Sequence, residues 1–280
     1  MNIHRSLALC AAALLICGTV HAQSVLTAPE PEPVAKPAPR VDANVPIPVF
    51  RLGISGGYNL GLHSADAMSL PTIPSCCPGY TSTTGGGVAL GAEAAIIMSP
   101  NIDLLARLMY QTASATMTTD EPTTIRDGNT TRETALRHTL TSSLGMLFFE
   151  PGVEYHMAGG FGFTGGIRIG VLMNATYTER ETFADPTIPY DYSDGSGVNN
   201  PSEGDLPEKN ALQFGLYLGA RYHIALNSAK TFHLVPAIEF APLFSEIVKE
   251  TSWSVSSFRA SIGLAITLIR YEALGSPLSP

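Results

Sequence analysis

The sequence predicts an all-β chain, folded as an eight-stranded antiparallel up-and-down transmembrane β-barrel. Apolar residues alternate with small or polar residues in eight separate stretches, and a period of two is the signature of a β-strand. Long and short connections alternate between these stretches. Charged residues make up only 14% of the 280 residues although the apolar content is an ordinary 45%, so much of the surface is expected to avoid water.

The composition excludes several classes of protein. The chain holds 26 glycines and 21 prolines, which argues against a coiled coil or a helix-rich enzyme. Its formal net charge of −8 argues against a nucleic-acid binder, because such a protein needs a basic surface for the phosphates. Beyond the N-terminus, no apolar run reaches the roughly 18 residues that a membrane-spanning helix requires.

The first 48 residues indicate export. Residues 1–22 have the pattern of a signal peptide, with Arg5 before an apolar stretch and a small residue, Ala22, at the expected cleavage site. Residues 23–48 are proline-rich, which favours an extended and stiff periplasmic linker. The linker is either a passive spacer or a tether that contacts the cell wall or another envelope protein.

The predicted barrel occupies residues 49–271 and is followed by a C-terminal tail, 272–280. Several strands are longer than the usual strand of a globular sheet and match the roughly 9 to 11 residues needed to cross a membrane. In the fourth strand Val153 and Tyr155 continue the apolar pattern in the phase opposite to Leu144 and Phe148, which predicts a β-bulge near Pro151. The alternating stretches cover 50–62, 87–98, 102–111, 140–155, 161–177, 212–224, 232–240 and 258–268.

The lengths of the connections also favour a barrel. Tight turns are expected at 99–101, 158–160 and 227–230. An up-and-down barrel with one plain rim and one elaborated rim sorts its connections in this way, whereas a Greek-key sandwich does not. The longer loops are expected at 63–86, 119–137, 180–209 and 245–252.

Each strand has an apolar phase, and we expect that phase to face lipid. The other phase is dominated by small residues, which suit the narrow lumen of an eight-stranded barrel. Aromatic residues at strand ends are expected to form interfacial girdles: Phe50, Tyr110, Tyr155, Phe161, Tyr177, Tyr222, Phe232, Trp253 and Tyr271.

Single charges on the lumen phase are expected to pair and to fill the barrel. Buried ion pairs roughly break even in energy, so their expected role is structural; a gated small pore is the alternative. Glu150 and Glu154 are expected to join this network after the bulge. The predicted lumen charge network consists of Arg51, Glu93, Asp103, Arg107, Arg168, Arg221, Glu239 and Arg259.

Eight alternating strands behind a signal peptide resemble the small outer-membrane β-barrels of the OmpA-like transmembrane type. The closer resemblance is to the PorT-like barrel domains of Bacteroidetes and Chlorobi-type bacteria. It covers about 49–271 and is carried by Cys76-Cys77-Pro78, by the segment from Pro151 to Tyr155, and by the opening of the last strand at 253–260. In one departure from the pattern, the last strand ends near Tyr271, whereas many such barrels end on a terminal aromatic residue.

The resemblance implies a cell outer-membrane location with both termini in the periplasm. It implies outer-membrane lipid and lipopolysaccharide as surroundings and the barrel-assembly machinery as a partner. The expected role is structural, or surface interaction through the long loops, with a narrow solute pore as the alternative. No cofactor, no metal and no nucleic acid is expected to bind.

An outer-membrane enzyme that modifies lipid or cleaves protein is a second alternative. His138 shares a strand face with Ser142, and His63 lies at the same rim, but serine is too common here for this spacing to be specific. We therefore expect no catalytic residues. His223 and His233 flank a tight turn and are expected to form a hydrogen-bonded pair, with metal ligation as the alternative.

Cys76 and Cys77 are the cysteines that remain after signal cleavage. They are either two loop thiols or a disulfide, since an export compartment is oxidising. A bond between neighbouring cysteines closes a strained ring. A redox or metal-binding pair is not favoured, because the CxxC spacing is missing.

Overall fold

A computed structural model describes residues 44–66, 68–70, 79–127, 129–188, 192 and 195–273. The predicted signal peptide, most of the predicted linker, Cys76, Cys77 and most of the C-terminal tail lie outside the described residues. Among the described residues, no helix is long and apolar enough to cross a membrane.

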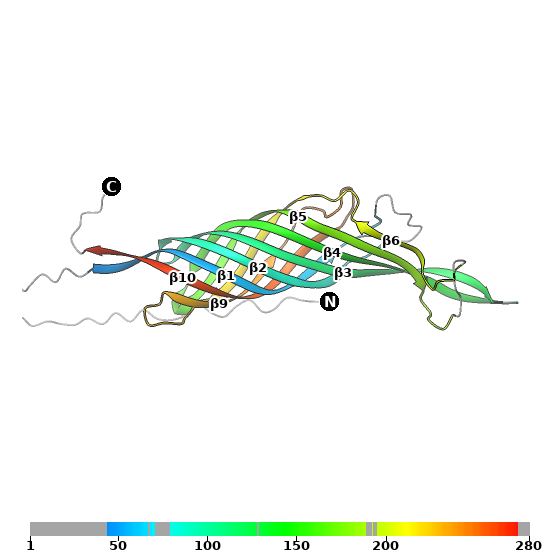
Figure 1. The fold of residues 1–280 in the computed structure, drawn as a ribbon, viewed down its shortest axis with the longest axis horizontal. Helices are drawn as coiled ribbons and strands as arrows, with labels where there is room; N and C mark the ends of the chain where they lie inside the picture. Colours follow the sequence, from blue (N-terminus) through cyan, green and yellow to red (C-terminus); the bar gives the residue numbers. More distant parts are fainter. Residues whose placement is uncertain are drawn as a thin grey trace, which may run out of the picture. The chain divides into compact units, whose positions relative to one another are not determined.

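Eight antiparallel strands form a closed ring, which confirms the predicted fold class (Figure 1). Each strand pairs with its neighbour along the chain, and β10 closes the ring by pairing with both β1 and β9. The ring consists of β1 (Asn44–Ser64), β2 (Thr83–Ser99), β3 (Ile102–Asp127), β4 (Thr130–His156), β5 (Phe161–Phe183), β7 (Leu212–Tyr222), β9 (Phe232–Ala241) and β10 (Ser254–Ala273). The short strands β6 (Asn199–Asp205) and β8 (Ile224–Ala225) pair with β5 and β9.

One end of the barrel carries only tight connections, as predicted from the loop lengths. We call it the turn end. Between β4 and β5 the turn is Ala158–Gly160, where a side chain on Gly160 would lie 2.9 Å from the carbonyl oxygen of His223, in a backbone conformation with φ +90°. Between β8 and β9, the side-chain oxygen of Asn227 accepts hydrogen bonds from two backbone N–H groups. The opposite end, which carries the long connections, is called the loop end.

The first strand begins earlier than expected. β1 starts at Asn44 rather than at 49, and Asn44 pairs with Ala273 at the turn end. The last residues of the predicted linker, including Pro46 and Pro48, therefore belong to the strand. β2 pairs with β1 only from Phe50 onward, so this extension has a free edge, where a proline without an N–H group breaks no ladder.

The expected loop at 119–137 is instead a β-hairpin. β3 and β4 remain paired without interruption from Ile102–Tyr155 to Asp127–Thr130. Pairing with β2 ends at Ser114, and pairing with β5 ends at Leu136, so the hairpin continues past both neighbours (Figure 1). Residues 119–138 are called the β3–β4 ribbon. Their many threonines favour a strand because a β-branched side chain packs well on a pleated surface.

A band of exposed apolar side chains surrounds the barrel. In β3 it includes Ile102, Leu104 and Leu108, and it ends where Tyr110 is followed on the same face by Thr112 and other hydroxyl residues. In β4 the outward-facing residues change from apolar to small and hydroxyl residues beyond Leu147 toward the loop end, and Leu147 is the cross-strand partner of Tyr110. The band in β3 runs from Ile102 to Tyr110. A tilted strand of this length is roughly 20–25 Å tall, the height of the apolar band of outer-membrane barrels.

The phase of β4 differs from the prediction. All even-numbered residues from His138 to Glu154 point inward, so Leu144 and Phe148 lie in the lumen rather than against lipid. The prediction of a β-bulge near Pro151 is wrong, because the pairing of β4 with β5 keeps one register from Phe149 to Gly152. The register shift occurs instead where Met146 pairs with Leu172 and Gly145 pairs with Asn174, which leaves Met173 of β5 as the extra residue.

Apolar side chains fill the interior toward the loop end, whereas the sequence predicts only small residues and paired charges in the lumen. Residues from the barrel wall, such as Met117, Leu140 and Leu144, pack against residues from the loops, including Ile247 and Val248. Two aromatic residues expected in the girdle belong to this region: Trp253 is fully buried in the cluster and Tyr177 packs against it. Of the other girdle residues, Tyr155, Phe161, Tyr222, Phe232 and Tyr271 are exposed on the exterior.

Candidate functional site

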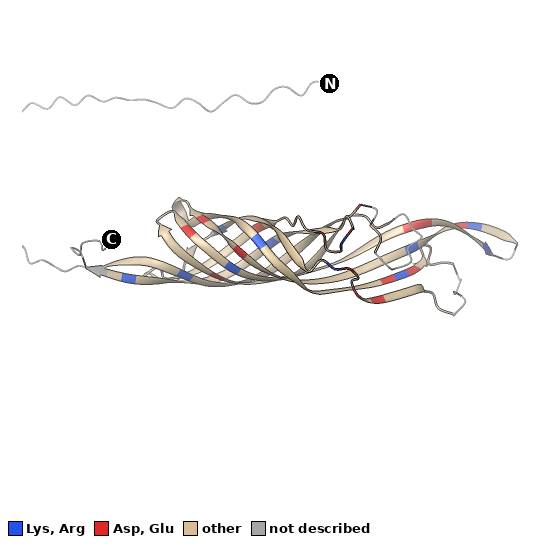
Figure 2. Cartoon of the chain, turned by 90° about the horizontal axis from the view of Figure 1, so that it is seen from above, with Lys and Arg blue, Asp and Glu red and all other residues tan. Residues whose placement is uncertain are grey.

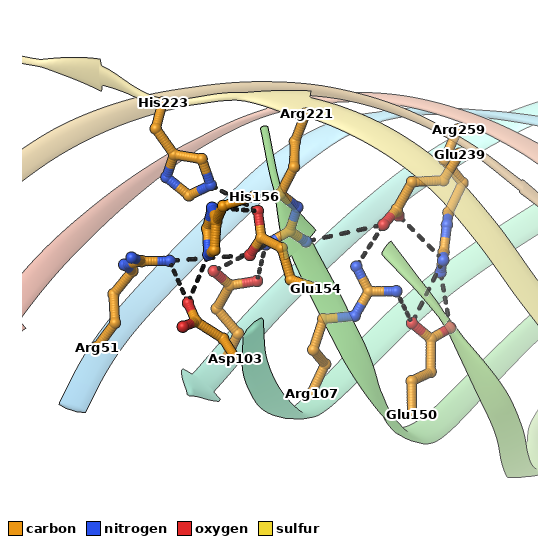
Figure 3. A network of polar contacts seen from close by, with 11 residues as sticks. Arg51, Asp103, Arg107, Glu150, Glu154, His156, Arg221, His223, Glu239 and Arg259 are labelled. Atoms are coloured by element: carbon orange, nitrogen blue, oxygen red, sulfur yellow. Dashed lines mark hydrogen bonds and ion pairs between the residues drawn. The ribbon is translucent and has the colours of Figure 1, made fainter. Parts of the chain in front are cut away.

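The charged residues of the lumen form two connected clusters of buried or half-buried side chains (Figure 3). Figure 2 shows where the charged residues fall along the strands. The deep cluster contains Arg107, Glu150, Arg168, Glu239 and Arg259, all of them buried. Two of its pairs are direct cross-strand neighbours: Arg107 faces Glu150 between β3 and β4, and Glu239 faces Arg259 between β9 and β10.

The same side chains also reach across the lumen. Arg259 of β10 contacts Glu150 of β4 at 2.8 Å, and Arg107 of β3 contacts Glu239 of β9. In a ring of eight strands, β3 lies opposite β9 and β4 lies opposite β10. These two ion pairs therefore connect opposite walls of the barrel and occupy its axis.

Arg168 of β5 completes the deep cluster. Its guanidinium lies 3.3 Å from Glu150, donates a hydrogen bond of 2.8 Å to Gln111, and stacks on the ring of Phe148 at 3.7 Å. Arg107 is similarly placed over the ring of Tyr217 at 4.1 Å. Contacts with carboxylates, an amide and aromatic rings together hold these buried cations in place.

The turn-end cluster contains Arg51, Glu93, Asp103, Glu154 and Arg221. Arg51 donates to Asp103 at 2.8 Å, and Arg221 contacts Glu93 at 3.0 Å and Glu154 at 3.5 Å. Arg221 also lies 3.8 Å from Glu239 and so connects this cluster to the deep one. Asp103 and Glu154 are cross-strand neighbours, so two carboxylates stand side by side and both face Arg51.

The two clusters balance in charge only as a whole. The deep cluster has three arginines and two carboxylates, and the turn-end cluster has two arginines and three carboxylates. With histidines neutral, the deep cluster carries +1 and the turn-end cluster −1. A buried charge without a partner is costly, which explains why the two clusters together contain equal numbers of arginines and carboxylates.

The structure places every residue of the predicted network inside the barrel and in an ion pair. Glu150 and Glu154 belong to it too, although the bulge that was to bring them there is missing. Sequence reasoning missed His156, whose Nε2 lies 2.8 Å from Asp103. The available signal was its position two residues after Glu154, on the same strand face.

Three histidines gather beside the turn-end cluster. The ring of His223 lies 5.3 Å from that of His156 and 5.9 Å from that of His233, measured between centroids. His223 Nε2 lies 2.6 Å from Glu154, so its hydrogen-bonding partner is a carboxylate and not the expected His233. Nδ1 of His223 and Nδ1 of His233 are buried and have no hydrogen-bonding partner.

His63 is held within the apolar layer at the loop end. It stacks with Trp253, whose indole N–H donates to His63 Nδ1 at 3.3 Å. His138 lies further out, with its ring nitrogens 3.5 Å from Glu121 and 3.8 Å from Glu181. Together with residues 179–181 and 200–202, His138 lines a cleft of about 260 Å³. The Ser142 hydroxyl donates instead to the backbone oxygen of Ala115.

The β3–β4 ribbon has its own electrostatics, outside the apolar band. Arg137 donates two hydrogen bonds to Asp120, at 2.8 and 2.9 Å, and these hold the pKa of Asp120 below its ordinary value. Arg132 contacts Asp185 at 2.6 Å, which connects the ribbon to the segment after β5. Hydrogen bonds from Thr187 lower the pKa of Asp185.

No protein-family model matches the chain, and comparison with curated proteins gives no significant match. Among solved structures, the attachment invasion locus protein Ail of Yersinia pestis has 10% sequence identity and a TM-score of 0.36, covering 78% of this chain and 99% of that one. For Neisserial surface protein A the values are 10%, 0.33, 78% and 97%. For the outer-membrane protease OmpT of Escherichia coli they are 8%, 0.32, 81% and 98%.

Three features of the chain itself determine the class of protein. Eight strands close into one hydrogen-bonded ring, a continuous apolar band faces outward, and the charges of the wall face inward. A closed ring satisfies every backbone group of the wall within the protein, which a β-structure in lipid requires. The chain is therefore a small outer-membrane β-barrel protein.

Proposed function

We propose that this protein is a non-conducting barrel that anchors and displays the β3–β4 ribbon and the neighbouring loops on the outside of the cell. The observation that carries the proposal is the filled lumen. Ion pairs between opposite walls occupy its axis, and the apolar layer with Trp253 lies toward the loop end. A cavity next to the deep cluster measures only about 20 Å³, room for about one water molecule.

The display role is supported by what continues past the barrel wall. The β3–β4 ribbon extends beyond its pairing with β2 and β5 and carries exposed charged side chains. Near the tip of the ribbon, Arg132 contacts Asp185 of the segment after β5 at 2.6 Å. In this proposal the loop end is extracellular, both described chain ends face the periplasm, and the apolar band contacts outer-membrane lipid and lipopolysaccharide. The barrel-assembly machinery is the proposed insertion partner.

We also propose that the protein is not an enzyme. His138 is the histidine best placed for catalysis at the loop end, but its ring faces carboxylates. The Ser142 hydroxyl donates to a backbone carbonyl, so its proton is committed to a structural bond. Nucleophilic catalysis by serine needs that proton to pass to a base.

Conductance in planar lipid bilayers tests the closed lumen. The full chain is inserted from detergent, and its fold is checked by the shift in gel mobility between unheated and heated samples. No discrete current steps are expected. Reproducible steps of one size would overturn the non-conducting proposal and favour the narrow pore.

An epitope tag inserted between Asp127 and Thr130, the last strand pair of the ribbon, tests the orientation. Antibody added to intact cells is expected to bind this tag. A second variant with the same tag before Asn44 is the matched control, and it should be labelled only after the outer membrane is permeabilised. The reverse pattern would place the loop end in the periplasm and overturn the display role.

A further inference from the structure

The turn end of the lumen holds a group of side chains that the proposed function does not use. Glu154, His156 and His223 each offer one ligand atom, and these atoms lie within 4.8 Å of one another. Five of the seven histidines fall within the described barrel, and three of those five are in this place. We propose that Glu154, His156 and His223 bind a divalent transition-metal ion of the zinc class.

One carboxylate oxygen is the centre of the site. Oε1 of Glu154 lies 2.6 Å from Nε2 of His223 and 3.8 Å from Nδ1 of His156. Zinc ligand distances of about 2.0–2.2 Å in a tetrahedral site place neighbouring ligand atoms roughly 3.3 Å apart. The first contact must lengthen and the second must shorten, each by less than about 1 Å, which side-chain rotation can supply.

The other carboxylate oxygen of Glu154, Oε2, faces two arginines. Oε2 faces Arg221 at 3.5 Å and Arg51 at 3.8 Å. The arginines and the histidines therefore approach different oxygens of the same carboxylate. An ion bound at Oε1 leaves both arginine contacts in place.

A neighbouring carboxylate orients one of the ligands. Nε2 of His156 is hydrogen-bonded to Asp103 at 2.8 Å, which turns Nδ1 toward Glu154. A histidine that binds a metal through one nitrogen commonly donates from the other nitrogen to a carboxylate, because this fixes its tautomer and orientation.

The second histidine has an unused nitrogen. Nδ1 of His223 is buried without a hydrogen-bonding partner. A metal ion bound through Nε2 would replace the present hydrogen bond to Glu154 and would leave Nδ1 to carry the proton of the ring. His233 lies close to this group, with its ring centroid 5.9 Å from that of His223.

The local charge favours a cation here. The turn-end cluster carries one more carboxylate than it has arginines, while the deep cluster carries the opposite excess. Two imidazoles with one carboxylate suit zinc, nickel, copper and cobalt, whereas magnesium and calcium prefer sites made of oxygen atoms alone. The site is therefore expected to select Zn²⁺ over Mg²⁺.

Titration calorimetry of the full chain in detergent, without a polyhistidine tag, tests the site. Zn²⁺ is expected to bind once per chain and Mg²⁺ is not. His156→Gln and His223→Gln should each weaken Zn²⁺ binding by at least about 10-fold, a loss typical of removing one ligand or its support. Co²⁺ absorption bands that change in the same variants provide a second reading.

Two control variants locate the binding. His138→Gln removes the other histidine that faces two carboxylates, and Cys76→Ser with Cys77→Ser removes the loop thiols; neither change should affect Zn²⁺ binding. All variants must keep the heat-dependent gel shift of a folded barrel. Absence of saturable Zn²⁺ binding to the folded chain, unchanged binding when both His156 and His223 are replaced, or loss of binding in either control would overturn the proposal.

Discussion

Replacing Glu150 by glutamine is predicted to be the most damaging change of a single charge in the lumen. Its carboxylate is fully buried and contacts three arginines: Arg107 at 2.7 Å, Arg259 at 2.8 Å and Arg168 at 3.3 Å. Glu150→Gln keeps the size of the side chain but leaves three arginines facing the single carboxylate of Glu239. Removing one partner of a buried ion pair costs about 3–5 kcal/mol.

The same change at Glu93 is the matched control. Glu93 is more accessible, with 14% of its side chain exposed, and its partner Arg221 keeps contacts with Glu154 and Glu239. Glu93→Gln should therefore lower the free energy of unfolding by less than Glu150→Gln does, because it leaves each arginine with a remaining carboxylate partner. Urea unfolding in lipid vesicles, followed by gel mobility, measures both variants.

A second change tests whether charge imbalance causes the loss. Arg168→Met removes one cation but keeps an apolar side chain against Phe148, over which the guanidinium stacks at 3.7 Å. In the Glu150→Gln background it returns the deep cluster to +1, so the double variant should be more stable than Glu150→Gln alone. If the two losses simply add, or if Glu150→Gln is no worse than Glu93→Gln, the explanation by charge balance is wrong.

Three further predictions concern other parts of the barrel. Trp253→Ala should lower the free energy of unfolding by about 3–5 kcal/mol, measured in the same urea assay, because it empties the centre of a packed apolar layer. Gly152→Ala should destabilise the barrel, because its methyl group would lie 2.1 Å from a tyrosine hydroxyl, whereas Gly56→Ala meets nothing closer than 3.5 Å and should be tolerated in that assay. Arg137→Ala should raise the pKa of Asp120 toward its ordinary value, measured by NMR titration in micelles. In the wild type this pair stabilises the ribbon above the ordinary carboxyl pKa, and the contribution is lost as the pH falls through the lowered pKa of Asp120.

The sequence pattern was sufficient for the ring of strands but not for what fills it. Period-two alternation and loop lengths depend on local chemistry, so the eight strands and the two unlike ends could be read directly. The apolar layer could not, because Leu140, Ile247 and Trp253 meet only after the loops fold into the barrel mouth. The ribbon was missed for a different reason. The sequence predicts a loop at 119–137 because these residues lack apolar alternation, although a strand outside the membrane needs no apolar face.

The phase of β4 follows from its charged residues and not from its apolar ones. A barrel in lipid offers two apolar environments, the exterior and any packed part of the lumen, so a large apolar side chain does not identify a face. A charged residue within the band does, because lipid cannot stabilise it. Glu150 and Glu154 occupy even positions, as do the apolar residues Leu144 and Phe148. The even positions of these carboxylates therefore indicate a single inward phase along β4, without a bulge. Phe148 then lies inside as the surface on which Arg168 stacks, a role that its hydrophobicity alone does not indicate.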